Sequence, residues 1–188
     1  MKIIENVSTV DVVNKILDQK IVTLFQGRSE AGERALGNRS ILFDPRNKDG
    51  KDIVNLVKRR ESFRPFAGTI LYEYAKDYFH MGSLDESPFM GFSLRCREEK
   101  IKEIPAIIHV DGTCRIQTLK RKQNPHYYKL ISQFYIMTGV PVLLNTSFNL
   151  AGDPLVETPE DAIDTLKKSK IDYLYLPEIN MLVENEYE

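Results

Sequence analysis

The feature that most limits the fold is a succession of short segments rich in β-branched and aromatic residues, such as Ile21-Val22-Thr23-Leu24-Phe25. Some of these segments are joined by helical patterns, and others by tight turns such as Asp111-Gly112. A helical connection allows two strands to run parallel, whereas a tight turn makes them antiparallel. We therefore expect an α/β fold with one mixed parallel and antiparallel sheet flanked by helices. Strands are expected at 21–25, 40–43, 68–72, 90–95, 106–110, 115–119, 140–144, 173–176 and 181–183.

Helices are expected from the apolar periodicity at 8–20, 49–58, 125–137 and 158–170. Ser8 and Thr158 are suitable N-caps, and Pro159 suits the first position of the last helix. Gly139 is typical of the residue that ends a helix.

Length and charge narrow the classes of protein. The chain has 188 residues, enough for one core and too few for two ordinary domains, so we expect a single domain over 1–188. Its formal charge of -1 gives no general attraction to nucleic acid or membrane, so any anion site must be local. With no signal segment and no membrane-spanning run, a cytoplasmic protein is expected. Cys96 and Cys114 are expected to be structural thiols.

An arginine- and glycine-rich loop follows the first predicted strand. It contains Arg28, Arg34 and Arg39 among Gly27, Gly32 and Gly37, and Arg64 follows later in Phe63-Arg64-Pro65-Phe66. Guanidinium groups bind phosphate oxygens, and glycines let backbone amides approach an anion closely, so the loop is a candidate phosphate cradle. The alternative is a set of surface arginines paired with nearby acids. The loop lacks the Gly-Lys-Ser/Thr ending of a P-loop.

Two further polar segments are candidate sites. The segment 109–117 places His109 and Asp111 on one face of a predicted strand, and Arg115 on the returning strand. No third metal-type ligand accompanies the pair, so no metal site is predicted. The other segment brings Asn145, Ser147 and Asn149 after a buried strand, where they either bind ribose or phosphate or satisfy a turn.

The ordered motifs resemble the carboxy-terminal domain of NodU/CmcH/TobZ-type O-carbamoyltransferases. They are found at 27–28 with 34–42, 63–67, 87–90, 109–113 and 142–149. The resemblance implies a YrdC-like fold, an open twisted sheet with a basic concave face. It also implies that carbamoyl phosphate and ATP, with Mg²⁺ on the triphosphate, react to give carbamoyl adenylate. A separate amino-terminal domain of the actin and sugar-kinase type, which bears a metal, then moves the carbamoyl group to an acceptor hydroxyl.

The resemblance also assigns roles to residues at the matching motifs. Arg28, Arg34, Arg39 and Arg64 would hold phosphates, with His109 and Asp111 on the same face. The implied nucleotide contacts are Arg115, Asn145, Ser147 and Asn149. No actin-type transfer domain is recognised within 1–188, so a separate domain or subunit is the expected partner.

Two other classes of function compete with this enzyme. One is a noncatalytic module that binds nucleotide or phosphate, and the other is a YrdC-like domain that binds RNA. The near-neutral charge and the lack of an exposed aromatic series argue against RNA. The acceptor substrate and the oligomeric state are left open by the sequence.

Overall fold

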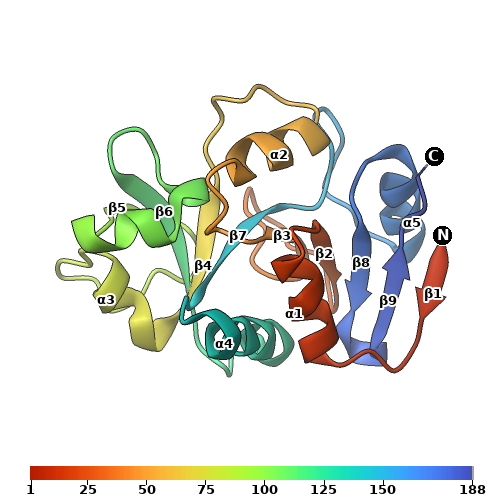
Figure 1. The fold of residues 1–188 in the computed structure, drawn as a ribbon, viewed down its shortest axis with the longest axis horizontal. Helices are drawn as coiled ribbons and strands as arrows, with labels where there is room; N and C mark the ends of the chain where they lie inside the picture. Colours follow the sequence, from red (N-terminus) through yellow and green to blue (C-terminus); the bar gives the residue numbers. More distant parts are fainter. Residues whose placement is uncertain (188) are drawn as a thin grey trace.

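A computed structural model of the chain describes residues 1–187 and is built on one nine-stranded sheet (Figure 1). The strand order is β1-β9-β8-β2-β3-β7-β4-β6-β5. The pairs β2 with β8 and β4 with β6 are parallel, and the other neighbours are antiparallel. The predicted mixed sheet is therefore confirmed. The strands are β1 (Lys2–Ile4), β2 (Val22–Phe25), β3 (Arg39–Phe43), β4 (Ala67–Leu71), β5 (Ser93–Arg95), β6 (Thr113–Leu119), β7 (Val142–Ser147), β8 (Tyr173–Leu176) and β9 (Met181–Glu184).

Helices begin and end where local sequence signals place them. Ser8 and Thr158 each form a capping box, with Asp11 and Asp161 respectively, and Gly139 ends its helix in the left-handed conformation. The α-helices are α1 (Thr9–Leu17), α2 (Gly50–Val57), α3 (Ala75–Tyr78), α4 (Pro125–Thr138) and α5 (Pro159–Lys168). Short 3₁₀ helices occur at η1 (Tyr72–Tyr74), η2 (Glu98–Glu103), η3 (Pro105–Ile107) and η4 (Pro177–Ile179).

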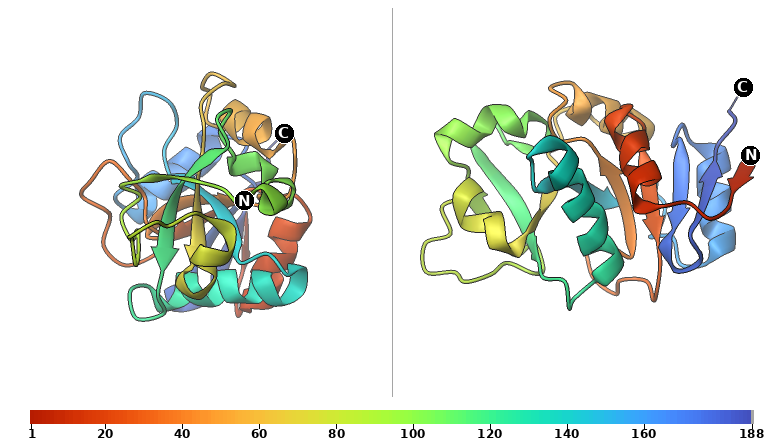
Figure 2. Two further views of the ribbon diagram at one scale, coloured as in Figure 1. Left: turned by 90° about the vertical axis from the view of Figure 1, so that its left-hand side faces the viewer. Right: turned by 60° about the horizontal axis from the view of Figure 1, so that its bottom comes forward.

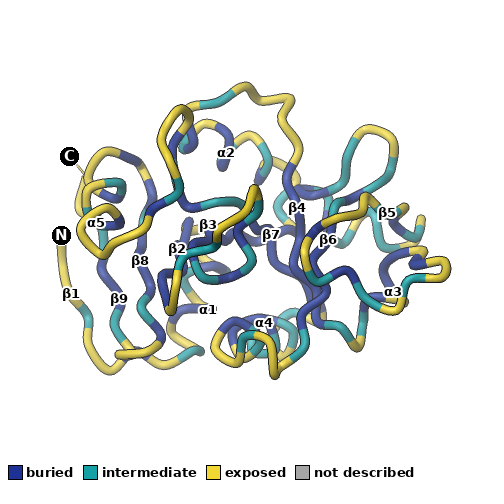
Figure 3. The backbone as a smooth tube through the Cα atoms, turned by 180° about the vertical axis from the view of Figure 1, so that it is seen from behind, coloured by how far each residue is buried: buried dark blue, intermediate teal, exposed yellow. Residues whose placement is uncertain are grey.

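The core lies between the central strands and the helices that cover them. Strands β2, β3 and β4 are buried along their whole length, and they form the dark centre of Figure 3. Helix α1 packs beside α4, as the right panel of Figure 2 shows. Cys96 and Cys114 are both buried free thiols, and burial raises the pKa of each. None of the helices within 1–187 is long and apolar enough to cross a membrane.

Three sequence predictions differ from the structure. Residues 106–110 do not form a strand, because Pro105 starts the 3₁₀ helix η3 and His109 closes a turn with Thr113. Asp111 and Gly112 therefore form a turn before β6, and the strand that pairs antiparallel with β6 is β5. The polar segment 145–147 continues β7 and is not a loop. Strand β1 was not predicted. It is an outermost strand of the sheet and pairs with β9.

The connections that carry the predicted site residues meet along the edge of the sheet at which the central strands begin or end. The strand pairing brings the end of β2, the starts of β3, β4 and β6 and the end of β7 to this edge. The segments 58–66, 108–112 and 148–157 lie along the upper side of Figure 1. Residues far apart in the sequence are thereby brought to one edge.

Candidate functional site

The loop 26–38 between β2 and β3 is held in place by carboxamide side chains from three strand regions. Asn145 of β7 donates to the carbonyl oxygen of Ala35 at 3.1 Å, and Gln117 of β6 donates to that of Leu36 at 3.0 Å. Gln26 donates to the carbonyl oxygen of Gly37 at 2.7 Å. These three amides are buried. The loop is therefore a fixed element, and Asn145 serves as one of its anchors in this structure.

Arg39 anchors the start of the same loop. Its Nη1 donates to the carbonyl oxygens of Gln26 and Asn38 at 2.7 and 2.9 Å, and its Nη2 donates to those of Gly27 and Glu157 at 3.2 and 3.0 Å. The guanidinium lies 3.6 Å from the centre of the Phe25 ring. Only 3% of Arg39 is exposed, and burial lowers its pKa. These four bonds make Arg39 a structural clamp of the loop in this structure, and its remaining donor, Nε, is buried without an acceptor among the described residues.

Glu30 completes the anchoring of the loop. One carboxylate oxygen accepts the backbone amides of Leu36 and Asn38 at 2.9 and 2.7 Å. Of the two other predicted loop arginines, Arg28 is exposed, and the side chain of Arg34 is 36% exposed with Nη1 3.5 Å from the Glu33 carboxylate. The loop thus presents Arg28 and Arg34 outward while Arg39 is bound within the protein.

Lys58, directly after α2, is buried against the end of β7. Its ammonium group donates to the carbonyl oxygens of Ser147 and Asn149 at 2.5 and 3.0 Å, and to the side-chain oxygen of Asn149 at 3.0 Å. Only 3% of Lys58 is exposed, and no carboxylate is among these partners. Burial, together with the charge of Arg60, lowers the pKa of Lys58 to about 7. The group is therefore poised between its charged and neutral forms near neutral pH.

Arginines gather beside Lys58. Burial lowers the pKa of Arg60 to about 10, and the charges of Arg64 and Arg115 add to this effect. Burial also lowers the pKa of Arg115, as does the charge of Arg34. Arg64 is half exposed and pairs with Glu61 at 2.8 Å. We call the set of Lys58, Arg60, Arg64, Arg115 and Arg34 the basic edge.

The basic edge contains donors that no protein group satisfies. Nη2 of Arg60 and Nε of Arg115 are buried, and neither has a hydrogen-bond acceptor among the described residues. Nε of Arg60 is bound to the Asn55 side chain at 2.6 Å, so the guanidinium is held in one orientation. Fixed like charges with unused donors are what a phosphate site requires.

His109 and Asp111 lie in the turn before β6 and are linked through Thr113. The Thr113 hydroxyl is 2.7 Å from the Asp111 carboxylate and 3.2 Å from Nδ1 of His109. Nε2 of His109 is 3.2 Å from the carbonyl oxygen of Phe66, so it carries a proton there. The turn is thereby tied to the start of β4, next to the basic edge.

The structure brings together predicted residues from three separate motifs, namely Arg34, Arg64 and Arg115, with Ser147 and Asn149 joined to them through Lys58. Lys58 and Arg60 were missed by the sequence analysis. Lys58 was assigned only to the end of a helix, where a lysine is usually solvated. The available signal was the basic triplet Lys58-Arg59-Arg60 directly before the Phe63-Arg64-Pro65 motif.

Comparison with known proteins identifies the family. The family model described as "Carbamoyltransferase C-terminus" matches residues 13–183. The chain belongs to this family. It is 49% identical to nodulation protein NolO of Bradyrhizobium diazoefficiens over 156 residues. This alignment covers 82% of this chain and 28% of NolO. The chain is 47% identical over 161 residues to nodulation protein NolNO of Sinorhizobium fredii, covering 85% of this chain and 24% of that protein. The chain thus spans about a quarter of the length of these relatives.

Solved structures share the fold. Full-length HypF in its phosphate- and nucleotide-bound form matches with a TM-score of 0.63 at 18% identity, over 98% of this chain and 22% of that chain. Sua5 of P. abyssi, complexed with L-threonine, matches with a TM-score of 0.62 at 11% identity, over 90% of this chain and 46% of that chain. The predicted YrdC-like fold and the carbamoyltransferase resemblance are therefore confirmed.

Proposed function

We propose that this chain binds carbamoyl phosphate and ATP at the basic edge and forms carbamoyl adenylate, which a separate domain or subunit transfers to an acceptor hydroxyl. The observation that carries this proposal is the pair of buried, unsatisfied donors on Arg60 and Arg115. Buried donors in folded proteins are nearly always paired, so these two fit a site whose acceptors come with the ligand. The HypF structure, which shares the fold, was solved with phosphate and nucleotide bound, and this supports the same ligand class.

The proposed formation of carbamoyl adenylate explains why the basic edge holds several positive charges. Water first takes the phosphoryl group from carbamoyl phosphate, which leaves carbamate and one phosphate. A carbamate oxygen then attacks the α-phosphorus of ATP, and the bond from that phosphorus to the pyrophosphate oxygen breaks. Two anions must approach each other in this step, so guanidinium groups fixed on both sides lower the repulsion and hold the reactants in line. Mg²⁺ would enter on the triphosphate, and we assign it no protein ligand.

Individual residues receive roles from their positions. Arg34, Arg60, Arg64 and Arg115 would bind phosphate oxygens, and Lys58 would gain its charge as the anion arrives. Ser147 and Asn149 would orient the nucleotide. His109 and Asp111 would position the turn beside Arg115, and Arg28 would reach bound phosphate from the exposed part of its loop. Because ATP is used, we place the reaction in the cytoplasm.

Pyrophosphate release tests the proposal. The chain, alone and with a family member's amino-terminal portion, is incubated with ATP, carbamoyl phosphate and Mg²⁺. Substitution of Arg60 or Arg115 by Gln should lower the rate by at least about a hundredfold, as expected when a donor to the transition state is lost. Arg121→Gln, in an exposed turn, is the matched control and should leave the rate unchanged. Nucleotide binding without pyrophosphate release, with the partner present, would instead indicate a noncatalytic binding module.

A further inference from the structure

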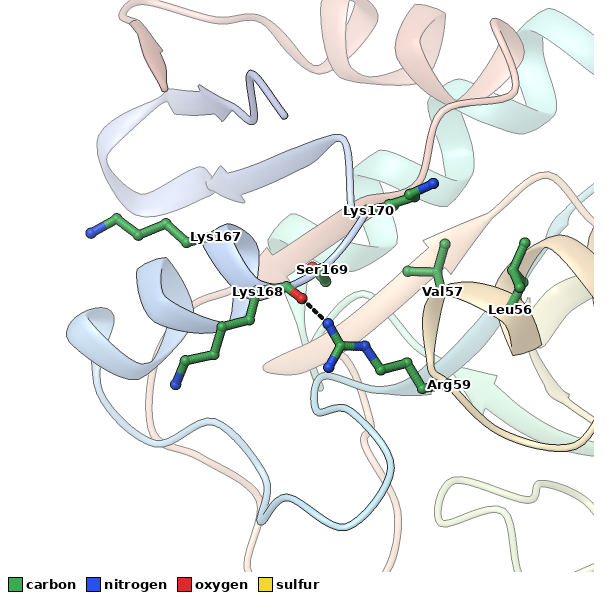
Figure 4. Close-up of a pocket in the computed structure, with 7 residues that line it drawn as sticks. All are labelled: Leu56, Val57, Arg59, Lys167, Lys168, Ser169 and Lys170. Atoms are coloured by element: carbon green, nitrogen blue, oxygen red, sulfur yellow. Dashed lines mark hydrogen bonds between the residues drawn. The ribbon is translucent and has the colours of Figure 1, made fainter. Parts of the chain in front are cut away.

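A second basic surface lies where the carboxyl-terminal ends of α2 and α5 meet (Figure 4). Two adjoining hollows form it. The first, of about 300 Å³, is lined by Leu56, Val57, Arg59, Lys167, Lys168, Ser169 and Lys170. The second, of about 510 Å³, shares Leu56 and Arg59 with the first, includes Glu61, and reaches Arg60 and Arg64, where it adjoins the basic edge. We call the two together the α2–α5 groove.

The groove concentrates positive charge on a chain whose formal net charge is -1. Two acids lie beside these basic groups: Glu61, which lines the second hollow, pairs with Arg64, and Asp164 lies 4.0 Å from Lys167. Lysines in the last turn of α5 are favourable for the helix dipole, and this explains Lys167 and Lys168. Lys170 lies beyond the end of α5, so the helix dipole does not explain it.

Arg59 fixes the shape of the groove. Its φ angle is +56°, in the left-handed region that residues with side chains rarely adopt. From this conformation Nη2 donates to the carbonyl oxygen of Lys168, which ties the end of α2 to the end of α5. The left-handed conformation itself belongs to the end of α2, because the backbone amides of Arg59 and Arg60 donate to the carbonyl oxygens of Leu56 and Asn55. The contact of Arg59 with Lys168 is what holds the two helix ends together.

The arrangement of the side chains suits an extended ligand. In Figure 4 the amino groups of Lys167, Lys168 and Lys170 point in different directions and do not converge on one point. A single small anion therefore cannot contact all three, whereas a segment with several carboxylates can. Leu56, on the rim, is 75% exposed and offers an apolar contact. None of the residues that line the groove is aromatic, so nucleic-acid bases would have no ring on which to stack.

We propose that the α2–α5 groove docks an acidic polypeptide segment that places an apolar side chain on Leu56. The charge of the groove selects for carboxylates, and its apolar rim selects for a protein over a simple polyanion. Relatives supply further polypeptide, because the chain spans only 24–28% of the nodulation proteins that it matches. This docking role goes beyond the proposed reaction and does not depend on it.

Fluorescence anisotropy with a labelled synthetic peptide tests the proposal. The probe carries Glu and Asp on both sides of a central Leu, and a Gln/Asn version is the uncharged control. The acidic peptide should bind, and its affinity should fall as salt increases. The double variant Lys168→Glu with Lys170→Glu should weaken binding by at least about tenfold, because like charges then face each other. The matched control, Arg121→Glu with Lys122→Glu in an exposed turn, should not.

Further variants separate the alternatives. Leu56→Ser should lower the affinity for the acidic peptide without changing the salt dependence of that affinity. If the double Glu variant does not fold, Lys168→Gln with Lys170→Gln should still show a lowered affinity. The proposal is overturned if the wild-type chain does not bind the acidic peptide, or if groove and control variants bind it equally. Tighter binding of a single-stranded RNA that the groove variants abolish would also overturn it. Sulfate affinity at the basic edge, measured in the same groove variants, should be unchanged, so this test and that of the proposed function fail separately.

Discussion

Anion binding at the basic edge should be coupled to proton uptake by Lys58. Lys58 is buried among oxygens of Ser147 and Asn149 without a carboxylate partner, and its pKa is lowered to about 7. An anion placed beside it supplies the missing negative charge and raises the pKa of Lys58 again. Binding above pH 7 therefore requires a proton that the free protein does not carry.

The size of the effect follows from the pKa. With a pKa of about 7, roughly a tenth of Lys58 is charged at pH 8, so binding should take up close to one proton per anion. The affinity should fall by up to about tenfold for each pH unit above 7. Sulfate is the suitable probe, because its own charge does not change in this range.

Isothermal titration calorimetry at pH 8 in two buffers with different ionisation enthalpies measures the uptake directly. Lys58→Met should remove the uptake and weaken sulfate binding, and Lys58→Arg should remove only the pH dependence. If the wild-type chain takes up no proton, or if Lys58→Met takes up as many as the wild type, the role given to Lys58 is wrong.

The same pKa has a consequence for stability. Between about pH 7 and the ordinary lysine pKa of 10.5, the unfolded chain holds a proton that folded Lys58 lacks. The unfolded state then binds more protons, so the contribution of Lys58 to the free energy of unfolding rises with pH across this window. The free energy of unfolding, measured by urea denaturation between pH 7.5 and 9.5, should rise less steeply with pH for Lys58→Met than for the wild type.

Four further substitutions, one of them a control, test how the loop and the helices are held. Arg39→Ala should lower the free energy of unfolding by about 2–4 kcal/mol in urea denaturation, because four carbonyl oxygens lose a charged donor; unchanged stability with lost sulfate binding would instead restore its ligand role. Gly37→Ala should cost about 1–3 kcal/mol, since φ is +109° and the added methyl meets the Tyr127 ring, whereas Gly32→Ala, with open space around it, should have little effect. The capping bonds lower the pKa of Asp161, so the stability they give is present above its ordinary pKa of 3.8 and is lost as the pH falls through the lowered pKa. In Asp161→Asn the melting temperature should therefore fall less as the pH is lowered.

Much of the fold was predictable because its signals are local. A capping residue such as Ser8 or Thr158 and a stop such as Gly139 act within a few positions, and the buried strands are marked by their β-branched residues. The exception at 106–110 shows the limit of such signals. Its apolar residues serve another contact, because Ile107 packs over Gly68, where a larger residue would collide with it. No property of the segment itself indicates that partner.

The segments that form the candidate site were predictable, but the orientation of their side chains was not. Strand ends pointed to the segments that the structure brings together, yet the direction of each arginine depends on distant residues. Arg39 is turned inward by the carbonyl oxygen of Glu157, which is 118 positions away. The ammonium group of Lys58 is held by the Ser147 carbonyl oxygen, which is 89 positions away at the end of β7. Such long-range contacts leave no pattern in a single sequence.

The two kinds of positive group at this edge serve different ends. Arg39 is surrounded by carbonyl oxygens, so its charge is already used in holding the loop, and a ligand would have to displace those bonds. Arg60 and Arg115 each have a buried donor left over, as Arg39 has in its Nε, but no backbone carbonyl oxygen of the described residues accepts from either of the two guanidinium groups. The charge of Arg115 also contributes to the lowered pKa of Arg60. That repulsion persists in the folded chain because each group is held by the surrounding packing. An anion bound there would relieve this repulsion, so the proposed phosphate ligand would offset an electrostatic cost of the folded chain.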